Sequence, residues 1–114
     1  MQKNILIVDD KLDDLKTMKN LLEKEGFNVR AVNNGAKAID VVNNNPFDLI
    51  LIDILMPIFS GYDLFNLLKG KLKTTKMAYV SIVPKKEANL RGIDGFIQKP
   101  FSPKEFATQI KEIL

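Results

Sequence analysis

The chain has 114 residues, of which 46% are hydrophobic and 27% are charged, a composition typical of one compact globular domain. Cysteine and histidine are both absent, which excludes disulfide bonds, thiolate and imidazole metal sites, and phosphohistidine chemistry carried by this chain itself. The net charge of +3 comes from lysines without interleaved aromatic residues, so a solvated face is favoured over a nucleic-acid site. No apolar run is long enough for a signal peptide or a membrane span, so we expect one cytoplasmic domain over residues 1–114.

Short runs rich in Ile, Leu and Val alternate with segments of helical periodicity, which predicts a parallel sheet covered by helices on both faces. The expected strands cover residues 4–9, 27–32, 48–53, 77–83 and 94–99. Helical segments are expected at residues 12–26, at residues 36–43, from the Ser60 cap to Gly70, and from the capping box at residues 102–105 onward. Five strands joined by right-handed crossovers predict a doubly wound α/β fold with strand order 2-1-3-4-5.

Polar residues follow several of these strands at the edge where their carboxyl ends meet. Asp9 and Asp10 end the first strand, Asp53 ends the third, Ser81 lies near the end of the fourth, and Lys99 ends the fifth. The first and third strands are neighbours whose connections leave toward opposite faces, so this edge is the topological switch point where such sheets bind ligands. Because neighbouring strands lie about 4.8 Å apart, these five side chains are expected to share one site.

The expected site combines three carboxylates with an ammonium and a hydroxyl group. Crowded carboxylates repel one another unless a cation lies between them. Mg²⁺ is the expected cation, because it prefers oxygen ligands and binds through one or two carboxylates together with phosphate oxygens. The set suits phosphoryl transfer, with Asp53 as the nucleophile that becomes an aspartyl phosphate.

Each residue also has a purely structural interpretation. Asp10 could cap the first helix, Ser81 could be an ordinary strand serine, and Lys99 could be a turn lysine. Asp13 and Asp14, in the first turn of the first helix, are expected only to favour its dipole. The five site residues taken together make coincidence hard to sustain.

Over essentially its whole length, the chain resembles the receiver domain of two-component response regulators. The motifs are the sequence ILIVDD at residues 5–10, the pattern D-x-x-M-P-x-x-x-G from Asp53 to Gly61, Ser81, and the sequence KPF that begins at Lys99. The resemblance implies that Asp53 accepts a phosphoryl group from the phosphohistidine of a histidine kinase or from a small phosphodonor.

The same resemblance implies roles for the other site residues. Asp10 and Asp53 would bind Mg²⁺, Asp9 would contribute through water or more weakly, and Leu55 would supply a backbone carbonyl. Lys99 would act with Asp53 in phosphoryl binding, and Ser81 and Phe96 would form the switch. Both the lysine and the serine would bind phosphate oxygens, and the serine would move inward as the phenylalanine changes rotamer.

The implied partners are a sensor histidine kinase or phosphotransfer protein upstream, and a downstream protein or fused output domain. A homodimer is a further option, whereas direct contacts with nucleic acid or membrane are not expected. The domain would be an autocatalytic phosphoacceptor rather than an independent enzyme.

The segment after the fourth strand departs from the family pattern. Between Ser81 and Gly92 the chain is about four residues shorter than usual, and Pro84 stands where the fourth helix would begin. We therefore expect that helix to be short, displaced or absent, and partner binding to be unusual. Ile82 replaces a commonly small residue and is expected to crowd the phosphate site.

Two apolar residues flank the expected path of water to the phosphoryl group. Leu55 and Val83 should exclude attacking water and give a long-lived phosphoryl group.

The main alternative to a phosphoacceptor is a receiver-like interaction module in which Asp53 never carries phosphate. A phosphatase is a weaker alternative because the motif lacks a second acid two residues after Asp53, and a nucleotide site lacks its Gly-rich loop.

Overall fold

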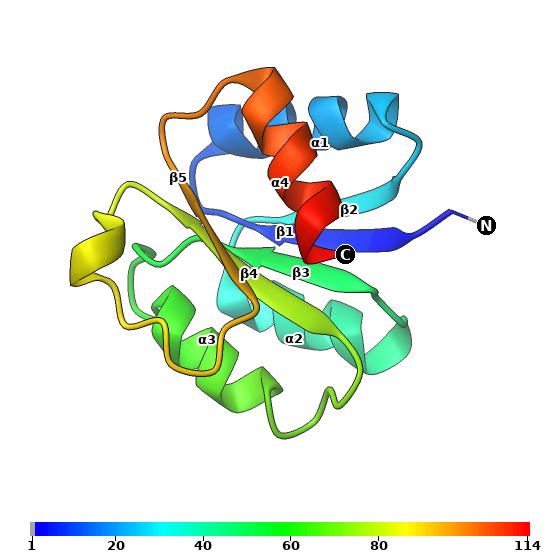
Figure 1. Cartoon of the computed structure of the whole chain (residues 1–114). Helices are drawn as coiled ribbons and strands as arrows, with labels where there is room; N and C mark the ends of the chain where they lie inside the picture. Colours follow the sequence, from blue (N-terminus) through cyan, green and yellow to red (C-terminus); the bar gives the residue numbers. More distant parts are fainter. Residues whose placement is uncertain (1) are drawn as a thin grey trace.

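The computed structural model describes residues 2–114 and contains five parallel strands with helices on both sides (Figure 1). The strands are β1 (Asn4–Val8), β2 (Asn28–Val32), β3 (Leu49–Ile52), β4 (Lys76–Ser81) and β5 (Gly95–Gln98). The helices are α1 (Leu12–Lys24), α2 (Gly35–Asn44), α3 (Gly61–Leu68) and α4 (Pro103–Ile113), with a short 3₁₀ turn η1 (Lys85–Glu87). The strand order is β2-β1-β3-β4-β5, which confirms the predicted doubly wound fold.

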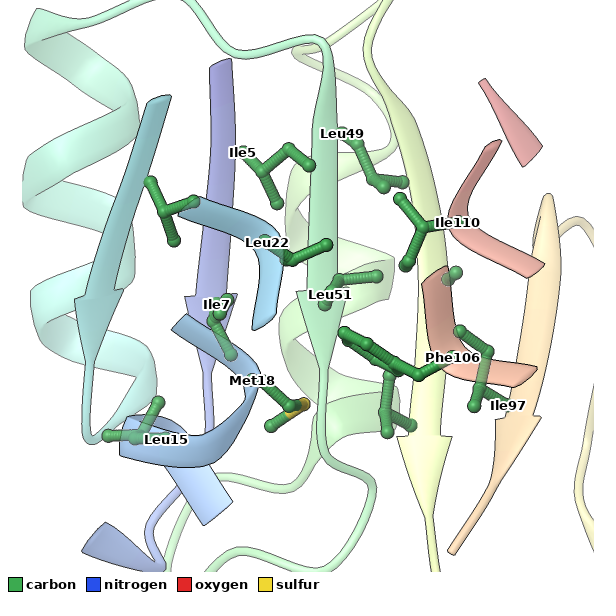
Figure 2. Packing of buried hydrophobic residues seen from close by; sticks show 13 residues of the cluster. Ile5, Ile7, Leu15, Met18, Leu22, Leu49, Leu51, Ile97, Phe106 and Ile110 are labelled. Carbon is green, nitrogen blue, oxygen red and sulfur yellow. The ribbon is translucent and has the colours of Figure 1, made fainter. Parts of the chain in front are cut away.

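The two faces of the sheet explain why the central strands are almost entirely apolar. Helices α1 and α4 cover one face, and α2 and α3 cover the other (Figure 1). Ile5 and Ile7 of β1 point into the first of these layers (Figure 2), where α1 and α4 supply Met18 and Phe106 among others. Leu6 belongs to the opposite cluster, because alternate residues of a strand face opposite sides of the sheet.

Serine caps fix where two helices begin, as the sequence predicts. At α3, the Ser60 hydroxyl accepts from the Asp63 N–H and the Asp63 carboxylate accepts from the Ser60 N–H. Ser102 and Glu105 form the same reciprocal pair at α4. Each pair satisfies amide groups that a helix start would otherwise leave without partners. Among residues 2–114, no helix is both long and apolar enough to cross a membrane.

Four predicted strands run one or two residues too far at their carboxyl ends. The paired register ends one residue before Asp9, Asp53 and Lys99, and each of these residues follows its strand and donates only its N–H to the neighbouring strand. Strand β4 stops at Ser81, which leaves Ile82 outside the sheet. The difference matters for the site, because the polar side chains begin where the sheet ends.

The segment between β4 and β5 lacks the α-helix that usually stands there in a doubly wound sheet. In its place is η1, whose amide groups at Glu87 and Ala88 both donate to the carbonyl of Pro84. Farther along, Leu90 and Ile93 pack against the apolar cluster beneath α2 and α3. The prediction of a short or distorted helix between β4 and β5 is therefore confirmed, and η1 projects at the left edge of Figure 1.

Candidate functional site

The acidic residues come together at the carboxyl edge of the sheet, as expected. Val8 and Ile52 are partners in the parallel register, so Asp9 and Asp53 follow on neighbouring strands. The Asp53 N–H donates to the Val8 carbonyl at 2.9 Å, which holds the backbone beside β1. One carboxylate oxygen from each of Asp9, Asp10 and Asp53 lies within 4.8 Å of the others.

Asp53 is buried and only partly satisfied by hydrogen bonds. It is 3% exposed, and its Oδ1 atom accepts one bond, at 3.4 Å, from the Leu55 N–H. Its Oδ2 atom has no hydrogen-bond partner within residues 2–114. Burial raises the pKa of Asp53 to about 6 against the opposing charge of Lys99, and the charge of Asp9 adds to the rise. A buried carboxylate oxygen without a partner is costly, which favours the approach of a cation or an electrophile.

Lys99 reaches into the site from the far side of β4. Its Nζ atom lies 2.7 Å from Asp9 Oδ2, 2.8 Å from Asp14 Oδ2 and 4.0 Å from Asp53 Oδ2. Burial by itself would lower the pKa of Lys99, but hydrogen bonds with Asp14 and Asp9 and the charge of Asp53 outweigh it and raise the pKa. The site therefore contains an ammonium group among three carboxylates, which favour its charged form.

Asp14 is a site residue that the sequence interpretation missed. The sequence assigned it only a favourable effect on the dipole of α1, yet its carboxylate hydrogen bonds to Lys99. One available signal is that Asp14 lies four residues before Met18, on the edge of the buried helical face. Asp13, its neighbour in the same turn, is exposed, as the dipole interpretation requires.

Asp10 does not cap the first helix. The residue at the cap position of α1 is Lys11, whose side chain makes no capping bond. Its backbone N–H instead donates to Asp9 Oδ1 at 2.9 Å. The structural interpretation of Asp10 as a cap is therefore wrong, and this exposed residue instead contributes a carboxylate oxygen to the acidic cluster.

Ser81 lies on β4, next to β3, and Phe96 lies on the following strand, β5. Ser81 is fully buried, and its hydroxyl accepts from the Val83 N–H at 3.2 Å. Phe96 is half-buried and is the register partner of Tyr79 in the β4–β5 pairing. The Ser81 hydroxyl is therefore bound to the loop after β4, and it would lose the bond from the Val83 N–H if it moved toward Asp53.

The loop after Asp53 is held close to the site. The Gly61 N–H donates to the Ile54 carbonyl at 2.8 Å, and a Cβ atom on Gly61 would lie 2.2 Å from the carbonyl oxygen of Asp53. Only glycine therefore permits this approach. Leu55 is 47% exposed, and Ile58 is fully exposed at a positive φ of 68°.

Ile82 lies beside the site rather than within the sheet. Its side chain is 56% exposed and lines a cavity of about 300 Å³ together with Asp14, Lys99 and Phe101. The expected crowding of the phosphate site by Ile82 stays a prediction.

The chemistry of the donors fits a hard divalent cation. Three carboxylates whose oxygens converge, one of them with a buried oxygen that has no hydrogen-bond partner within residues 2–114, match the oxygen ligation that Mg²⁺ prefers. The adjacent ammonium and hydroxyl groups can stabilise negative charge on a phosphoryl group.

Comparison with known proteins identifies the family. Residues 5–111 match the family model of the response regulator receiver domain. The chain belongs to this family. It is a phosphoacceptor signalling domain of two-component systems, and receiver domains exchange signals with histidine kinases and output domains.

Curated relatives of this receiver domain are longer proteins. The probable transcriptional regulator ycf29 of Porphyra purpurea is 32% identical over 120 residues, which cover 100% of this chain and 57% of the relative. The response regulator SaeR of Staphylococcus aureus is 30% identical over 115 residues, which cover 97% of this chain and 50% of the relative. The chain thus spans about half the length of these relatives.

Solved structures support the same fold. The crystal structure of the response regulator TrrA from Thermotoga maritima, in complex with Mg²⁺–BeF, matches with a TM-score of 0.90 and 26% sequence identity. The match covers 99% of this receiver domain and 100% of TrrA.

Proposed function

We propose that Asp53 of this receiver domain accepts a phosphoryl group from the phosphohistidine of a sensor histidine kinase or phosphotransfer protein, or from a small phosphodonor. The observation that carries the proposal is Asp53 Oδ2, a buried oxygen without a hydrogen-bond partner in residues 2–114, 4.0 Å from the Lys99 ammonium. In transfer from phosphohistidine, this carboxylate forms the new P–O bond as the donor's P–N bond breaks, and the bonding pair stays on the imidazole; with acetyl phosphate the donor's P–O bond breaks and acetate leaves with the pair.

Asp10 and Asp53 would hold Mg²⁺, with Asp9 contributing more weakly and the Leu55 carbonyl completing the protein ligands. The converging carboxylate oxygens support this assignment, and TrrA, a relative by fold and sequence, was crystallised with Mg²⁺–BeF. When bound, Mg²⁺ would neutralise the charge that develops on phosphoryl oxygens. The side chains of this receiver domain position the acceptor and limit the access of water.

Lys99 and Ser81 would each bind one phosphoryl oxygen in the active arrangement. The ammonium group already lies near Asp53, and the hydroxyl group lies at the end of the neighbouring strand β4. As the serine leaves the Val83 N–H, Phe96 on β5 would change rotamer. The phosphorylated state would then favour a different surface on β4, β5 and the segment between them.

Intact-mass measurement after incubation with Mg²⁺ and acetyl phosphate or phosphoramidate tests the assignment of Asp53. We expect wild type to gain one phosphoryl group, Asp53→Ala to gain none, and Asp13→Ala, which alters an exposed acid, to behave as wild type. A phosphoryl adduct retained in Asp53→Ala would contradict the assignment. Failure of wild type to accept phosphate from either small donor or from a kinase would contradict the phosphoacceptor proposal.

We extend the proposal to the surroundings of the site. Residues 1–114 would form a single receiver domain in the cytoplasm, acting on a downstream protein or a fused output domain, with no direct nucleic-acid or membrane binding. The domain would be a phosphoacceptor and not an independent enzyme, and a homodimer is one form that its active state could take.

A second candidate is a receiver-like interaction module that works without phosphorylation. The presence of η1 in place of a helix between β4 and β5 favours this candidate, because a helix at that position would normally carry part of the output surface. The phosphoryl adduct described above separates the two candidates, since only the phosphoacceptor requires it.

A further inference from the structure

The hydrogen bonds of Lys99 go to two carboxylates other than the proposed acceptor. Asp9 and Asp14 lie 2.7 and 2.8 Å from its Nζ atom, whereas Asp53 lies at 4.0 Å, beyond hydrogen-bond distance. An ammonium group has three donors, and two of them are committed on the side of α1. A group bound to Asp53 therefore competes with these two bonds for the position of the ammonium group.

The two carboxylates that hold Lys99 differ in their freedom to release it. Asp9 is fully buried, and its other oxygen accepts from the Lys11 N–H, so both of its oxygens are fixed. The Asp14 side chain is 39% exposed and lines the cavity of about 300 Å³ beside Ile82. Asp14 can therefore exchange its bond to Lys99 for water at a smaller cost than Asp9 can.

We propose that Asp14 restrains Lys99 in a resting position and thereby lowers the affinity of the site for a phosphoryl group at Asp53. The inference rests on the proposed roles of Asp53 and Lys99. Asp14 is a positioning residue, because it acts only through the ammonium group and not on the phosphoryl group. Its position in the first turn of α1 makes this helix part of the control of phosphorylation.

The affinity for beryllofluoride in the presence of Mg²⁺ tests this role without requiring turnover. Asp14→Asn removes the charged partner of Lys99 at nearly constant shape. Asp13→Asn removes the same charge from the same helical turn at an exposed residue, for which the described chain shows no bond to Lys99. We expect Asp14→Asn to bind beryllofluoride with a Kd about fivefold lower than wild type, the size of a partly exposed ion pair, and Asp13→Asn to match wild type. An equal or higher Kd for Asp14→Asn than for Asp13→Asn would overturn the proposal.

The ¹⁵N resonance of the Lys99 ammonium group in metal-free protein gives a second measurement. In wild type this group should exchange slowly with water, and its chemical shift should change in Asp14→Asn and Asp14→Ala but not in Asp13→Asn. An unchanged Lys99 signal in both Asp14 variants would show that the restraint does not exist. Asp14→Ala also covers the case in which the asparagine still accepts a bond from Lys99.

The outcomes separate this inference from the proposed function on which it rests. If wild type binds beryllofluoride and takes phosphate on Asp53, but the Asp14 variants match Asp13→Asn, only the restraint is wrong. If wild type binds no beryllofluoride with Mg²⁺ and forms no aspartyl phosphate, the proposed function is wrong, and the restraint is wrong with it.

Discussion

At the scale of single residues, Asp53 is placed where its charge is costly. Its carboxylate lies at the end of a central strand, with one long hydrogen bond and one oxygen that has no partner within residues 2–114. Lys99 offsets part of the cost from 4.0 Å, yet burial still raises the pKa of Asp53 to about 6. The folded protein therefore stores free energy in an acceptor that favours a proton, a cation or a phosphoryl group over solvent.

Replacing Asp53 by asparagine should stabilise the metal-free protein at neutral pH. The folded state raises the pKa of this group from 3.8 to about 6, so in this interval the folded state binds more protons than the unfolded state. Wild type consequently loses stability as the pH rises from about 4 to 6 relative to the variant. Above pH 6 the free energy of unfolding of Asp53→Asn should exceed that of wild type by on the order of 2 kcal/mol, and near pH 4 the gap should close.

Urea unfolding at pH 4 and pH 7.5 in the presence of a chelator measures this gap. Asp13→Asn is the control for a changed charge at an exposed position. A gap of the same size at both pH values would mean that the charge of Asp53 carries no cost in the fold.

Apolar residues near the acceptor should slow hydrolysis of the phosphoryl group. Leu55 is half-exposed beside Asp53, and Val83 is partly buried two residues after Ser81. Polar replacements that can orient water, Leu55→Asn and Val83→Glu together, should speed loss of the aspartyl phosphate by about tenfold or more. Intact-mass decay curves measure the rate, with Leu67→Asn on the exposed side of α3 as the control. Identical decay in all three proteins would refute the role assigned to these residues.

At the scale of elements, the segment between β4 and β5 is held by side chains rather than by a helix. The Gln98 amide group donates to the carbonyls of Ser81 and Val83, and its carbonyl oxygen accepts from the Lys85 N–H. From α3, the Tyr62 hydroxyl accepts from the Asn89 N–H at 3.0 Å. Two polar clamps therefore position the segment that replaces the fourth helix.

Removing one clamp should loosen one end of this segment. In Gln98→Ala, amide hydrogen exchange at Lys85 should accelerate about tenfold, because the lost bond is worth on the order of 1 kcal/mol. Tyr62→Phe is the matched control, since it frees the Asn89 amide and leaves the Gln98 bonds intact. If Lys85 exchanged equally fast in wild type and Gln98→Ala, the clamp would have no role in holding η1.

The elements show why some features could be predicted from the sequence. The central strands are buried on both faces, so the apolar runs around Ile7 and Leu51 identify them directly. The predicted strands extended a residue or two too far, since side-chain type does not reveal where the paired register between strands ends. The absence of an α-helix between β4 and β5 was predictable because Pro84 and a short segment leave little room for one.

The contact between Asp14 and Lys99 joins residues 85 positions apart, and no local pattern contains it. Helical periodicity places Asp14 at the edge of the buried face of α1, but does not reveal what that edge meets. The convergence of Asp9, Asp10 and Asp53 was predictable because the strand order alone brings the ends of β1 and β3 together. The orientation of the Ser81 hydroxyl toward Val83 depends on the loop after β4, which the sequence does not define.

At the scale of the whole molecule, the site lies between the two helical layers. From its strand β1 the chain passes into α1 on one face, and from β3 it passes into α3 on the other (Figure 1). Asp14 belongs to the first layer, whereas Gly61, in contact with the Asp53 backbone, begins a helix of the second. A change at Asp53 can therefore be felt on both faces of the sheet.

The presence of η1 in place of a helix between β4 and β5 affects the coupling free energy between phosphorylation and partner binding. A rearrangement that exchanges only the polar bonds of this segment, and keeps the packing of Leu90 and Ile93, costs a few kcal/mol at most, which corresponds to a change in partner affinity of about a hundredfold. Linkage is reciprocal, so a partner that binds this segment preferentially in the phosphorylated state must favour phosphorylation by the same factor. The output partner is therefore expected to act as an effector of the input reaction, and the reach of the signal in either direction is set by the strength of the clamps at Gln98 and Tyr62.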